Sequence, residues 1–444
     1  MNHTKIMGTI GPASFDPKVI EELILAGISS CRINFSHATY DQAEEIIHNI
    51  RTISRRLNRP VAIRQDLQGP KIRIGELEEN AYPLPVGHKI VFTRRETVGN
   101  ATRATIAQPE FIEAMEAGCE IIIGDNDIKL VVEEKLNPDE IRCKVTIPGT
   151  LRPRKGACAP GTLIRFKGLT EKDIRDFEFG ISQHVDCVSM SFVQTADDLD
   201  RLKAIMAAHN VKIPILAKIE QRNALENLDA ILANCDGVSA ARGDLAVERP
   251  IEELHLIDKE IIRRANLAGK FVFTGSGILK SLMKTSWPTR AEVCDVSALV
   301  LDGIDAISFS DETAVGQDPV GCVKILSGII ARTEAAMLTN CTGRPNAGFF
   351  RSIQPNFAVS NGDTPIVMMA ENVEQVSRIA KMHYTAPVIA AVQDSNLANF
   401  LAHYWGVFPI YCPEPLSRTD CLDLARQEAV RIGIIHDSQP VIRL

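Results

Sequence analysis

Two stretches of the sequence end an apolar run with opposite charges. PILAKIE, residues 214–220, ends in Lys218 and Glu220, and the later run VSAARGD leads into Arg242 and Asp244. Because successive strand side chains point to opposite faces, residues two apart share a face, so each pair is expected to project together from the end of a strand. A single pair of this kind is usually a salt bridge. Two in succession favour a catalytic cluster.

Polar residues follow the other apolar runs of the first 330 residues in the same way. In chain order they are Arg32, Asn34, Ser36, His37, Asp66, Lys71, Arg73, Lys218, Glu220, Arg242, Asp244, Thr274, Ser276, Ser310 and Glu312. Two carboxylates that meet at one site suit Mg²⁺, which takes one or two protein carboxylates plus water and substrate oxygens. The cations suit a phosphoryl group, whose transfer needs positioning and charge neutralisation. Backbone N–H groups at Gly243 and Asp244, where a helix is expected to begin, suit a carboxylate.

The elements that position these residues repeat as strand, turn and amphipathic helix. Eight apolar runs are expected as strands, at residues 5–11, 28–36, 61–67, 185–193, 214–220, 237–244, 270–277 and 305–312. The pattern predicts an α/β fold, a (β/α)8 barrel. A doubly wound sheet is the alternative, but the polar endings fall at every strand's C-terminal end, where barrel active sites are built.

One interval interrupts the repeat of strand, turn and helix. Residues 68–161 read as short β-runs with turns, which predicts a small inserted β-barrel domain that closes over the mouth as a lid. The barrel is then expected from residues 1–67 and 162–338. After the linker NCTGRPNAGFF, residues 339–444 alternate strand and helix and predict a C-terminal α/β domain.

Composition excludes several classes of protein. The formal net charge of −7 gives no argument for nucleic acid or an anionic membrane as partner. No apolar run is long enough to span a membrane. Eleven scattered cysteines without a CxxC pair, and no signal peptide pattern, predict a cytoplasmic protein.

The chain resembles the pyruvate kinase family. The resemblance rests on an ordered set of motifs: KIMGTIGPAS, CRINFSHA, QDLQGPKIRIGEL, RKGACAPG, MSFVQTADDL, AKIE, ARGDLAVE, PTRAE and SDETAVGQDP. It implies phosphoryl transfer from phosphoenolpyruvate to ADP in glycolysis, giving pyruvate and ATP, with Mg²⁺ or Mn²⁺ as cofactor. It also implies a homo-oligomer, a tetramer or a dimer.

The resemblance also implies roles for individual residues. Glu220 and Asp244 would hold the divalent ion, and Gly243 and Asp244, through the N-terminal amides of their helix, would bind the substrate's carboxylate. The catalytic group would be Lys218, Arg32, Arg73 and Ser276, of which Arg32, Lys218 and Ser276 would also bind substrate. The nucleotide would be bound by His37, Asn34, Arg73 and Lys155. Ser276 stands where the family usually has threonine.

Two departures concern a monovalent cation. Many family members require K⁺, bound at the positions of Asn34, Ser36, Asp66 and a threonine, with a glutamate after the GP pair. Here the threonine is Leu67 and the glutamate is Lys71. Because an ammonium is a compact single positive charge, Lys71 is expected to replace K⁺. The paired change resembles the K⁺-independent branch of the family.

Other departures keep alternatives open. Gln68, Ala246, Gly277 and Asp311 differ from the family's usual residues, and MMAENVEQVSRI stands where sugar-phosphate-activated members have a Ser/Thr-Gly-rich loop. The C-terminal segment also reads as shorter than the family's. One alternative is therefore a catalytically weakened binding or sensor protein. Another is an enzyme that processes enolpyruvate or oxaloacetate on the same barrel.

Overall fold

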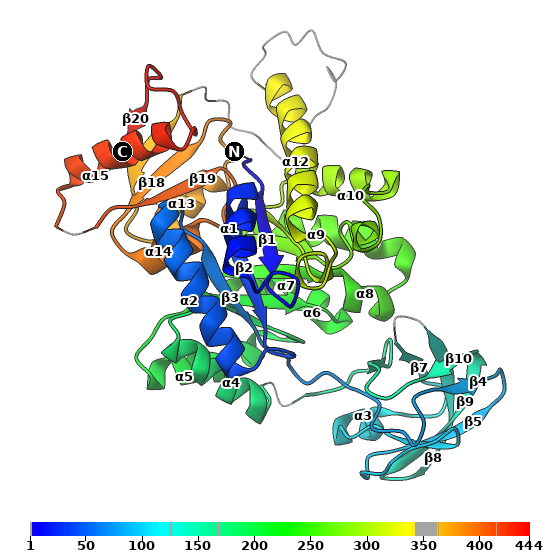
Figure 1. The fold of residues 1–444 in the computed structure, drawn as a ribbon. Helices are drawn as coiled ribbons and strands as arrows, with labels where there is room; N and C mark the ends of the chain where they lie inside the picture. The colour runs from blue at the N-terminus through cyan, green and yellow to red at the C-terminus, as the bar shows by residue number, and fades with distance from the viewer. Residues whose placement is uncertain (1, 125–126, 167–168, 342–361, 363, 414) are drawn as a thin grey trace.

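A closed barrel of eight parallel strands forms the centre of the molecule (Figure 1). The computed structural model describes residues 2–341 except 125–126 and 167–168, together with 362, 364–413 and 415–444. The barrel strands are β1 (Lys5–Thr9), β2 (Ile28–Asn34), β3 (Ala62–Asp66), β12 (Cys187–Met190), β13 (Ile215–Ile219), β14 (Gly237–Ala241), β15 (Phe271–Gly275) and β16 (Ala306–Ser308). Each strand lies within one of the eight predicted runs, so the prediction of a (β/α)8 barrel is confirmed.

Helices surround the barrel and bury its outer face. They are α1 (Pro17–Ala26), α2 (Tyr40–Leu57), α4 (Glu171–Ser182), α5 (Asp200–Ala208), α6 (Arg222–Glu226), α7 (Leu228–Asn234), α8 (Arg242–Glu248), α9 (Leu254–Leu267), α10 (Arg290–Leu301), α11 (Asp311–Ala314) and α12 (Pro319–Cys341), with 3₁₀ turns η1 (Ala196–Leu199), η2 (Ile251–Glu253) and η3 (Lys280–Met283). Reciprocal capping boxes at Thr39, Thr170 and Thr289 fix where α2, α4 and α10 begin.

The strand register places the polar residues at the C-terminal ends of the strands at the same level along the barrel axis. Asn34 on β2 lies opposite Asp66 on β3, and Asp66 lies opposite Ser189 on β12. On the next pair, Lys218 of β13 lies opposite Ser239 of β14. The parallel strands therefore present these side chains around one mouth of the barrel.

The segment inserted after β3 forms sheets of its own. Its elements are β4 (Tyr82–Leu84), β5 (Lys89–Thr93), β6 (Arg103–Thr105), α3 (Pro109–Ala114), β7 (Glu120–Ile123), β8 (Ile128–Asn137), β9 (Glu140–Ile147), β10 (Gly149–Leu151) and β11 (Ala157–Cys158). Among the described residues they pair as a six-stranded sheet, β11-β7-β8-β9-β5-β6, and a separate pair, β10-β4. The edge strands β11 and β6 do not pair with each other, but the chain between β3 and β4 bridges both edges, from Arg73 to Gly156 beside β11 and from Ile74 to Ile106 beside β6, which agrees with the predicted small β-barrel.

The C-terminal segment forms a parallel sheet in the order β19-β18-β17-β20. Its elements are β17 (Ile366–Met369), α13 (Val373–Ala380), β18 (Val388–Val392), α14 (Ser395–Leu401), β19 (Val407–Tyr411), α15 (Arg418–Arg431) and β20 (Ile442–Arg443). Alternate residues bury its two faces: Met368 and Ala390 pack with Phe271 of the barrel, whereas Val367 and Ile389 pack with α15. Residues 342–350 of the expected linker lie outside the described part of the chain.

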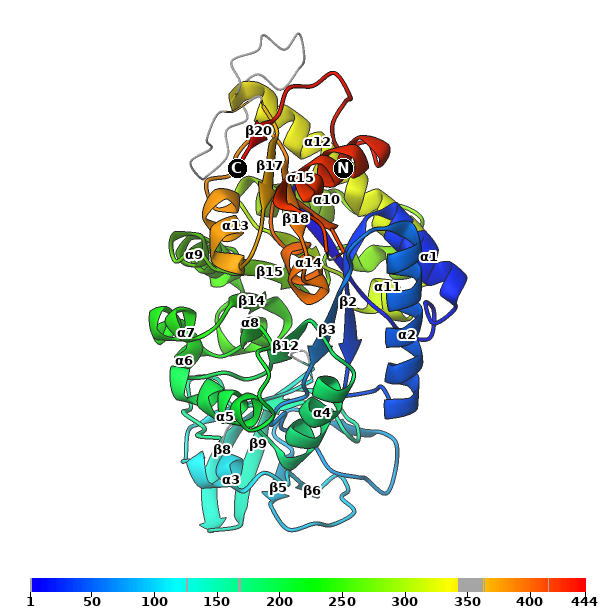
Figure 2. The same cartoon turned by 90° about the vertical axis from the view of Figure 1, so that its left-hand side faces the viewer.

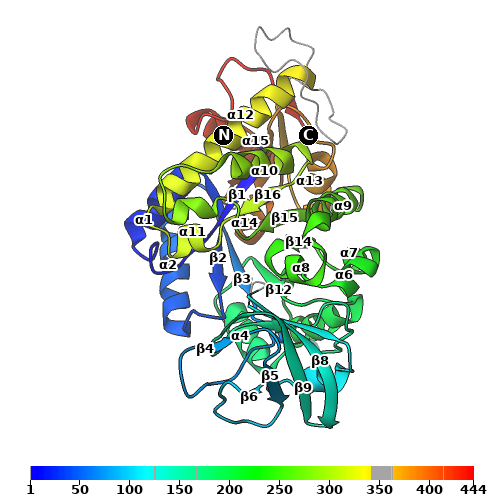
Figure 3. The same ribbon diagram turned by 90° about the vertical axis from the view of Figure 1, so that its right-hand side faces the viewer.

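The two additions lie at opposite ends of the barrel, as Figures 2 and 3 show from two sides. The C-terminal sheet covers the end where the strands begin, and His403 there bonds through Nε2 to Ser30 Oγ of β2 at 2.9 Å. The inserted segment faces the end where the strands finish. Within the described ranges, no helix is both long and apolar enough to cross a membrane.

Candidate active site

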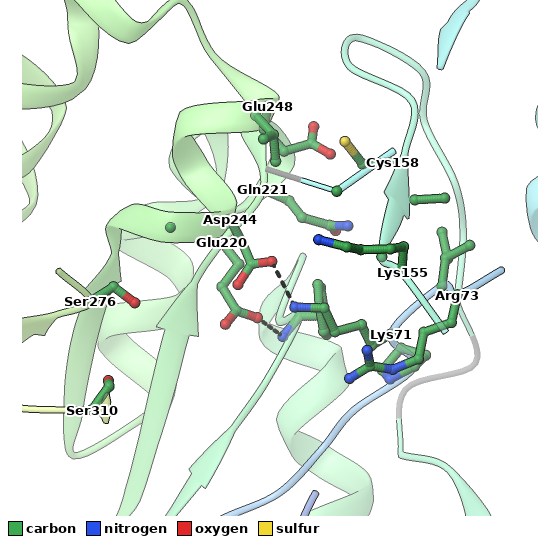
Figure 4. A pocket seen from close by; sticks show the side chains of 18 of the residues that line it. Lys71, Arg73, Lys155, Cys158, Glu220, Gln221, Asp244, Glu248, Ser276 and Ser310 are labelled. Atoms are coloured by element: carbon green, nitrogen blue, oxygen red, sulfur yellow. Dashed lines mark hydrogen bonds and ion pairs between the residues drawn. The ribbon is translucent and has the colours of Figure 1, made fainter. Parts of the chain in front are cut away.

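Two cavities open at the mouth of the barrel. One of about 630 Å³ lies between the barrel and the inserted segment, and a deeper one of about 210 Å³ reaches into the barrel. Both are lined by Arg32, Asn34, Lys71, Arg73, Phe192, Glu220, Asp244, Ser276 and Ser310. Figure 4 shows the larger one, with Lys155 and Arg73 on the side of the inserted segment and the carboxylates opposite. The structure therefore brings most of the predicted site residues together.

Lys218 and Glu220 project together from the end of β13, as their spacing predicts. The Nζ atom of Lys218 lies 2.9 Å from Glu220 Oε1 and 3.6 Å from Asp66 Oδ1, and it donates to Ser191 Oγ at 2.8 Å. Burial alone would lower the pKa of Lys218, but the negative charges of Asp66 and Glu220 outweigh it and raise the pKa. Lys218 is therefore held as a cation in a fixed position.

A strained backbone turn anchors Glu220. Its side chain is 1% exposed, and Oε2 accepts a 2.7 Å hydrogen bond from the backbone N–H of Phe192. Phe192 has a φ of 58°, a conformation that few non-glycine residues adopt. Burial raises the pKa of Glu220, with Lys218 opposing the shift and Asp244 adding to it. The neighbouring carboxylates thus repel each other in the absence of a cation between them.

Asp66 and Arg32 form a buried ion pair beside this group. Arg32 donates through Nε to Asp66 Oδ2 at 2.6 Å and through Nη1 to Thr9 Oγ1 at 3.2 Å. Burial would raise the pKa of Asp66, but Arg32, Lys218 and Arg64 together hold it well below its ordinary value. Asp66 is therefore a permanent anion that orients two of the predicted catalytic cations.

Lys71 lies against Asp244. Its Nζ is 3.2 Å from Asp244 Oδ1, and both side chains are about one-third exposed (Figure 4). Lys71 borders the same deep cavity as Asn34, Ser36 and Asp66, and Leu67, 1% exposed, lines it too. The ammonium is nevertheless paired with a predicted divalent-ion ligand and not with Asp66. Replacement of K⁺ by Lys71 stays a prediction.

The first turn of α8 meets the loop after β15. A Cβ atom added at Gly243 would lie 3.3 Å from Ser276 Oγ, so glycine leaves room for the serine hydroxyl at the mouth. Ser276 has a φ of 72° and Gly277 a φ of 65°. A β-branched threonine would be more strained than serine in this conformation.

Two of the predicted nucleotide residues, Asn34 and Arg73, line both cavities, but the other two do not share one. His37 is exposed and lines the deep one, whereas Lys155 lines the larger one and pairs through Nζ with Asp127 at 3.0 Å. Asn34 accepts the backbone N–H of Ser36 through Oδ1 at 3.1 Å. Arg73 donates to the carbonyl of Arg154 at 3.0 Å. His37 and Lys155 therefore flank the mouth without sharing a pocket.

Arg242 and Thr274 line neither cavity, and the prediction that they belong to the mouth was wrong. Arg242 and Asp244 were expected to share a strand face, but the strand ends at Ala241 and both belong to α8. Residues two apart on a helix point in different directions, and Arg242 bonds Asp295 through both terminal nitrogens, at 3.1 and 2.8 Å. Thr274 is fully buried and donates to the carbonyl of Ala240.

The cavities are also lined by Glu312 and by three residues that depart from the family's usual ones, Gln68, Gly277 and Asp311. Glu312 is 2% exposed, and its Oε2 accepts the backbone N–H of Ser310 at 3.0 Å. It lines the larger cavity together with Gly277 and Asp311, while Gln68 lines the deep one.

The carboxylates fit a divalent ion such as Mg²⁺. Glu220 and Asp244 supply hard oxygen ligands at the same cavity, and their mutual repulsion is what a cation between them would relieve. No group of three or more histidine, cysteine or acidic side chains suited to a metal occurs among the described residues. Two carboxylates are the number Mg²⁺ often takes when substrate oxygens and water complete its shell.

Sequence reasoning missed two side chains in this site. Ser191, directly after β12, accepts from Lys218 and donates to the carbonyl of Leu67 at 2.7 Å. Arg64 lies inside the barrel below Asp66 and lines the deep cavity. Both lie in runs that the sequence predicts as strands. Ser191 stands at the C-terminal end of one such run, and Arg64 is a charged residue two positions before Asp66.

Comparison with known proteins identifies the family. Residues 1–323 match the family model described as pyruvate kinase, barrel domain, which is well over half of the chain. The chain belongs to the pyruvate kinase family. It is an enzyme, a phosphotransferase. The family model that matches describes the barrel domain.

Similar proteins extend this match along nearly the whole chain. The chain is 36% identical over 449 residues to the pyruvate kinase of Geobacillus stearothermophilus and 34% identical over 448 residues to pyruvate kinase 2 of a Synechocystis species. Each alignment covers 99% of this chain and 76% of the relative. The pyruvate kinase of Bacillus licheniformis is 32% identical over 461 residues. The chain thus spans about three quarters of the length of these relatives.

Proposed function

We propose that this pyruvate kinase family member transfers the phosphoryl group of phosphoenolpyruvate to ADP, giving pyruvate and ATP. The observation that carries the proposal is the arrangement at the end of β13, where the largely buried cation Lys218 contacts both Glu220 and Asp66. Phosphoryl transfer depends on a fixed positive charge near the transferred group and requires little covalent chemistry by the protein.

Lys218 would neutralise the phosphoryl oxygens as the bond to the enol oxygen breaks and a bond to the terminal phosphate oxygen of ADP forms. Arg32 and Arg73, which line both cavities, would add positive charge around the same group. Glu220 and Asp244 would hold Mg²⁺ or Mn²⁺, which when bound supplies charge neutralisation for the substrate's oxygens.

The backbone at Gly243 and the hydroxyl of Ser276 would hold the rest of phosphoenolpyruvate. Gly243 lies in the first turn of α8, where N–H groups have no partner within the helix, and these suit a carboxylate. Ser276 would lie near the methylene carbon that takes up a proton to complete pyruvate.

The nucleotide would lie between the barrel and the inserted segment, residues 68–161, acting as a lid. Asn34, His37, Arg73 and Lys155 are the candidate contacts, and the 630 Å³ cavity has room for a diphosphate and its sugar. Closure of such a segment would exclude water, so that ADP and not water receives the phosphoryl group.

The remaining parts of the proposal concern setting and assembly. We place the catalytic domain at residues 1–67 and 162–338 and the C-terminal domain at 339–444. The enzyme would act in glycolysis in the cytoplasm as a homotetramer or homodimer. It would not need K⁺, because Lys71 brings a cation to the mouth.

A weakened binding or sensor protein is the second candidate. The ion pair between Lys71 and Asp244 favours it, since the ammonium occupies an oxygen that the divalent ion would need. The presence of Lys218, Glu220 and Asp244 argues for turnover, because these are the groups to which phosphoryl transfer is assigned.

Replacing Lys218 by methionine tests the function. Lys218→Met should abolish pyruvate release from phosphoenolpyruvate and ADP while leaving phosphoenolpyruvate binding measurable by calorimetry. Lys212→Met, which removes an exposed lysine just before β13, is the matched control and should retain full activity. A fully active Lys218→Met enzyme would remove Lys218 from the mechanism, and an inactive wild type that binds phosphoenolpyruvate would favour the sensor.

A further inference from the structure

Arg64 occupies the interior of the barrel, one level below the catalytic group. It lies on β3 two residues before Asp66, so both side chains point to the same face of the strand, and Arg64 is only 2% exposed. Its terminal nitrogens donate to Ser189 Oγ on β12 at 3.1 Å and to Ser308 Oγ on β16 at 3.3 Å. Its guanidinium carbon lies 4.6 Å from the centre of the Phe273 ring.

The charge of Arg64 is not balanced by a direct partner. Within the described residues, no carboxylate lies within 4.0 Å of its guanidinium, and its buried Nε has no hydrogen-bond partner. Burial lowers the pKa of Arg64 only to about 10, so it is protonated at neutral pH. Serine hydroxyls and an aromatic face hold the cation in place without neutralising it.

The least exposed charged groups around the deep cavity therefore carry a surplus of positive charge. Arg32, Arg64 and Lys218 supply three cations, while Asp66 and Glu220 supply two carboxylates. The cavity of about 210 Å³ that begins at the mouth reaches down to Arg64. A charge at its floor, shielded from water, acts on whatever anion enters from above.

We propose that Arg64 is a positioning residue that strengthens binding of the anionic substrate through its fixed positive charge beneath the mouth, without touching the substrate. The proposal rests on the proposed function for the identity of that anion. Two residues along a strand span about 7 Å, so a ligand above Asp66 lies roughly 10 Å from Arg64. At the effective dielectric constant of about 20 typical of protein sites, one charge pair at that distance changes affinity about tenfold.

The test compares three replacements of the same side chain. Arg64→Met and Arg64→Gln both remove the charge, but glutamine keeps a polar group for the two serines, whereas Arg64→Lys keeps the charge and loses the planar fork. We expect KM for phosphoenolpyruvate to rise about tenfold in the first two variants with kcat changed less than about threefold, and Arg64→Lys to restore KM. The rise should persist at about 0.5 M salt, because a buried charge is little screened.

A purely structural role predicts a different pattern. If Arg64→Gln behaves like wild type while Arg64→Lys raises KM, hydrogen bonding to the serines matters and the charge does not, which overturns the proposal. If Arg64→Met fails to fold, the glutamine and lysine variants still decide. If the wild type never forms pyruvate, the proposed function is refuted. The role of Arg64 is then decided separately, by comparing the affinity of the wild type and the Arg64 variants for phosphoenolpyruvate by calorimetry.

Discussion

The ion pair between Lys71 and Asp244 links the segment that leads to the lid with the carboxylate that would hold the divalent ion. Lys71 follows Gly69 and Pro70, where the chain leaves β3 for the inserted segment. Since its Nζ lies 3.2 Å from Asp244 Oδ1, a metal ion at Asp244 must displace or repel this ammonium. Removing the ammonium should therefore tighten metal binding in the absence of substrate.

The size of the effect follows from the exposure of the pair. The side chains of Lys71 and Asp244 are 34% and 35% exposed, so their attraction is that of a partly solvated ion pair. Such pairs contribute up to about 1 kcal/mol. Lys71→Met should therefore lower Kd for Mn²⁺ by about two- to fivefold.

Electron paramagnetic resonance of free Mn²⁺ measures this Kd without substrate or turnover. Lys71→Arg keeps the positive charge and should bind Mn²⁺ like wild type, while Asp244→Asn should bind it far more weakly and so shows that the intended site is being measured. An unchanged or weaker Kd for Lys71→Met would refute the competition between Lys71 and the metal ion.

Two further predictions concern cations and pH. Turnover should be equal, within about twofold, in K⁺ and in tetramethylammonium, and Lys71→Glu should create a requirement for K⁺ because it removes the cation that the mouth already holds; a wild type dependent on K⁺ contradicts this. Burial raises the pKa of Asp258 from the ordinary 3.8 to about 7, so the folded chain keeps a proton that the unfolded chain has released. The free energy of unfolding should therefore fall as the pH rises from about 4 to 7, and urea titrations of Asp258→Asn should show a smaller fall; equal falls in both proteins would sink the idea.

The sequence was sufficient for the barrel because local patterns determine it. Each of the eight strands is a short apolar or small-residue run with a polar ending, and strand alternation alone places Lys218 beside Glu220. The same rule failed at Arg242, since the strand ends at Ala241, three residues before the end of the predicted run, and the chain turns at once into α8. Strand alternation does not apply within a helix, and propensity does not fix element boundaries that closely.

Other features depend on contacts that are distant in sequence. The partner of Lys71 is Asp244, 173 residues away, and no local pattern relates the two. In the inserted segment, the two edges of the sheet are bridged by Arg73 and Ile74, a pairing that alternation does not specify. Arg64 could have been noticed, because a charge in the middle of a buried strand is uncommon. Its partners Ser189 and Ser308, however, come from two other strands.

The most direct test of the central claim follows phosphorus itself. Wild-type protein is mixed with phosphoenolpyruvate, ADP and Mg²⁺, and ³¹P nuclear magnetic resonance records the fate of the phosphoryl group while pyruvate is measured in the same sample. The account predicts that each phosphoenolpyruvate consumed gives one ATP and one pyruvate. Release of inorganic phosphate without ATP, or binding of phosphoenolpyruvate with no consumption, would contradict it.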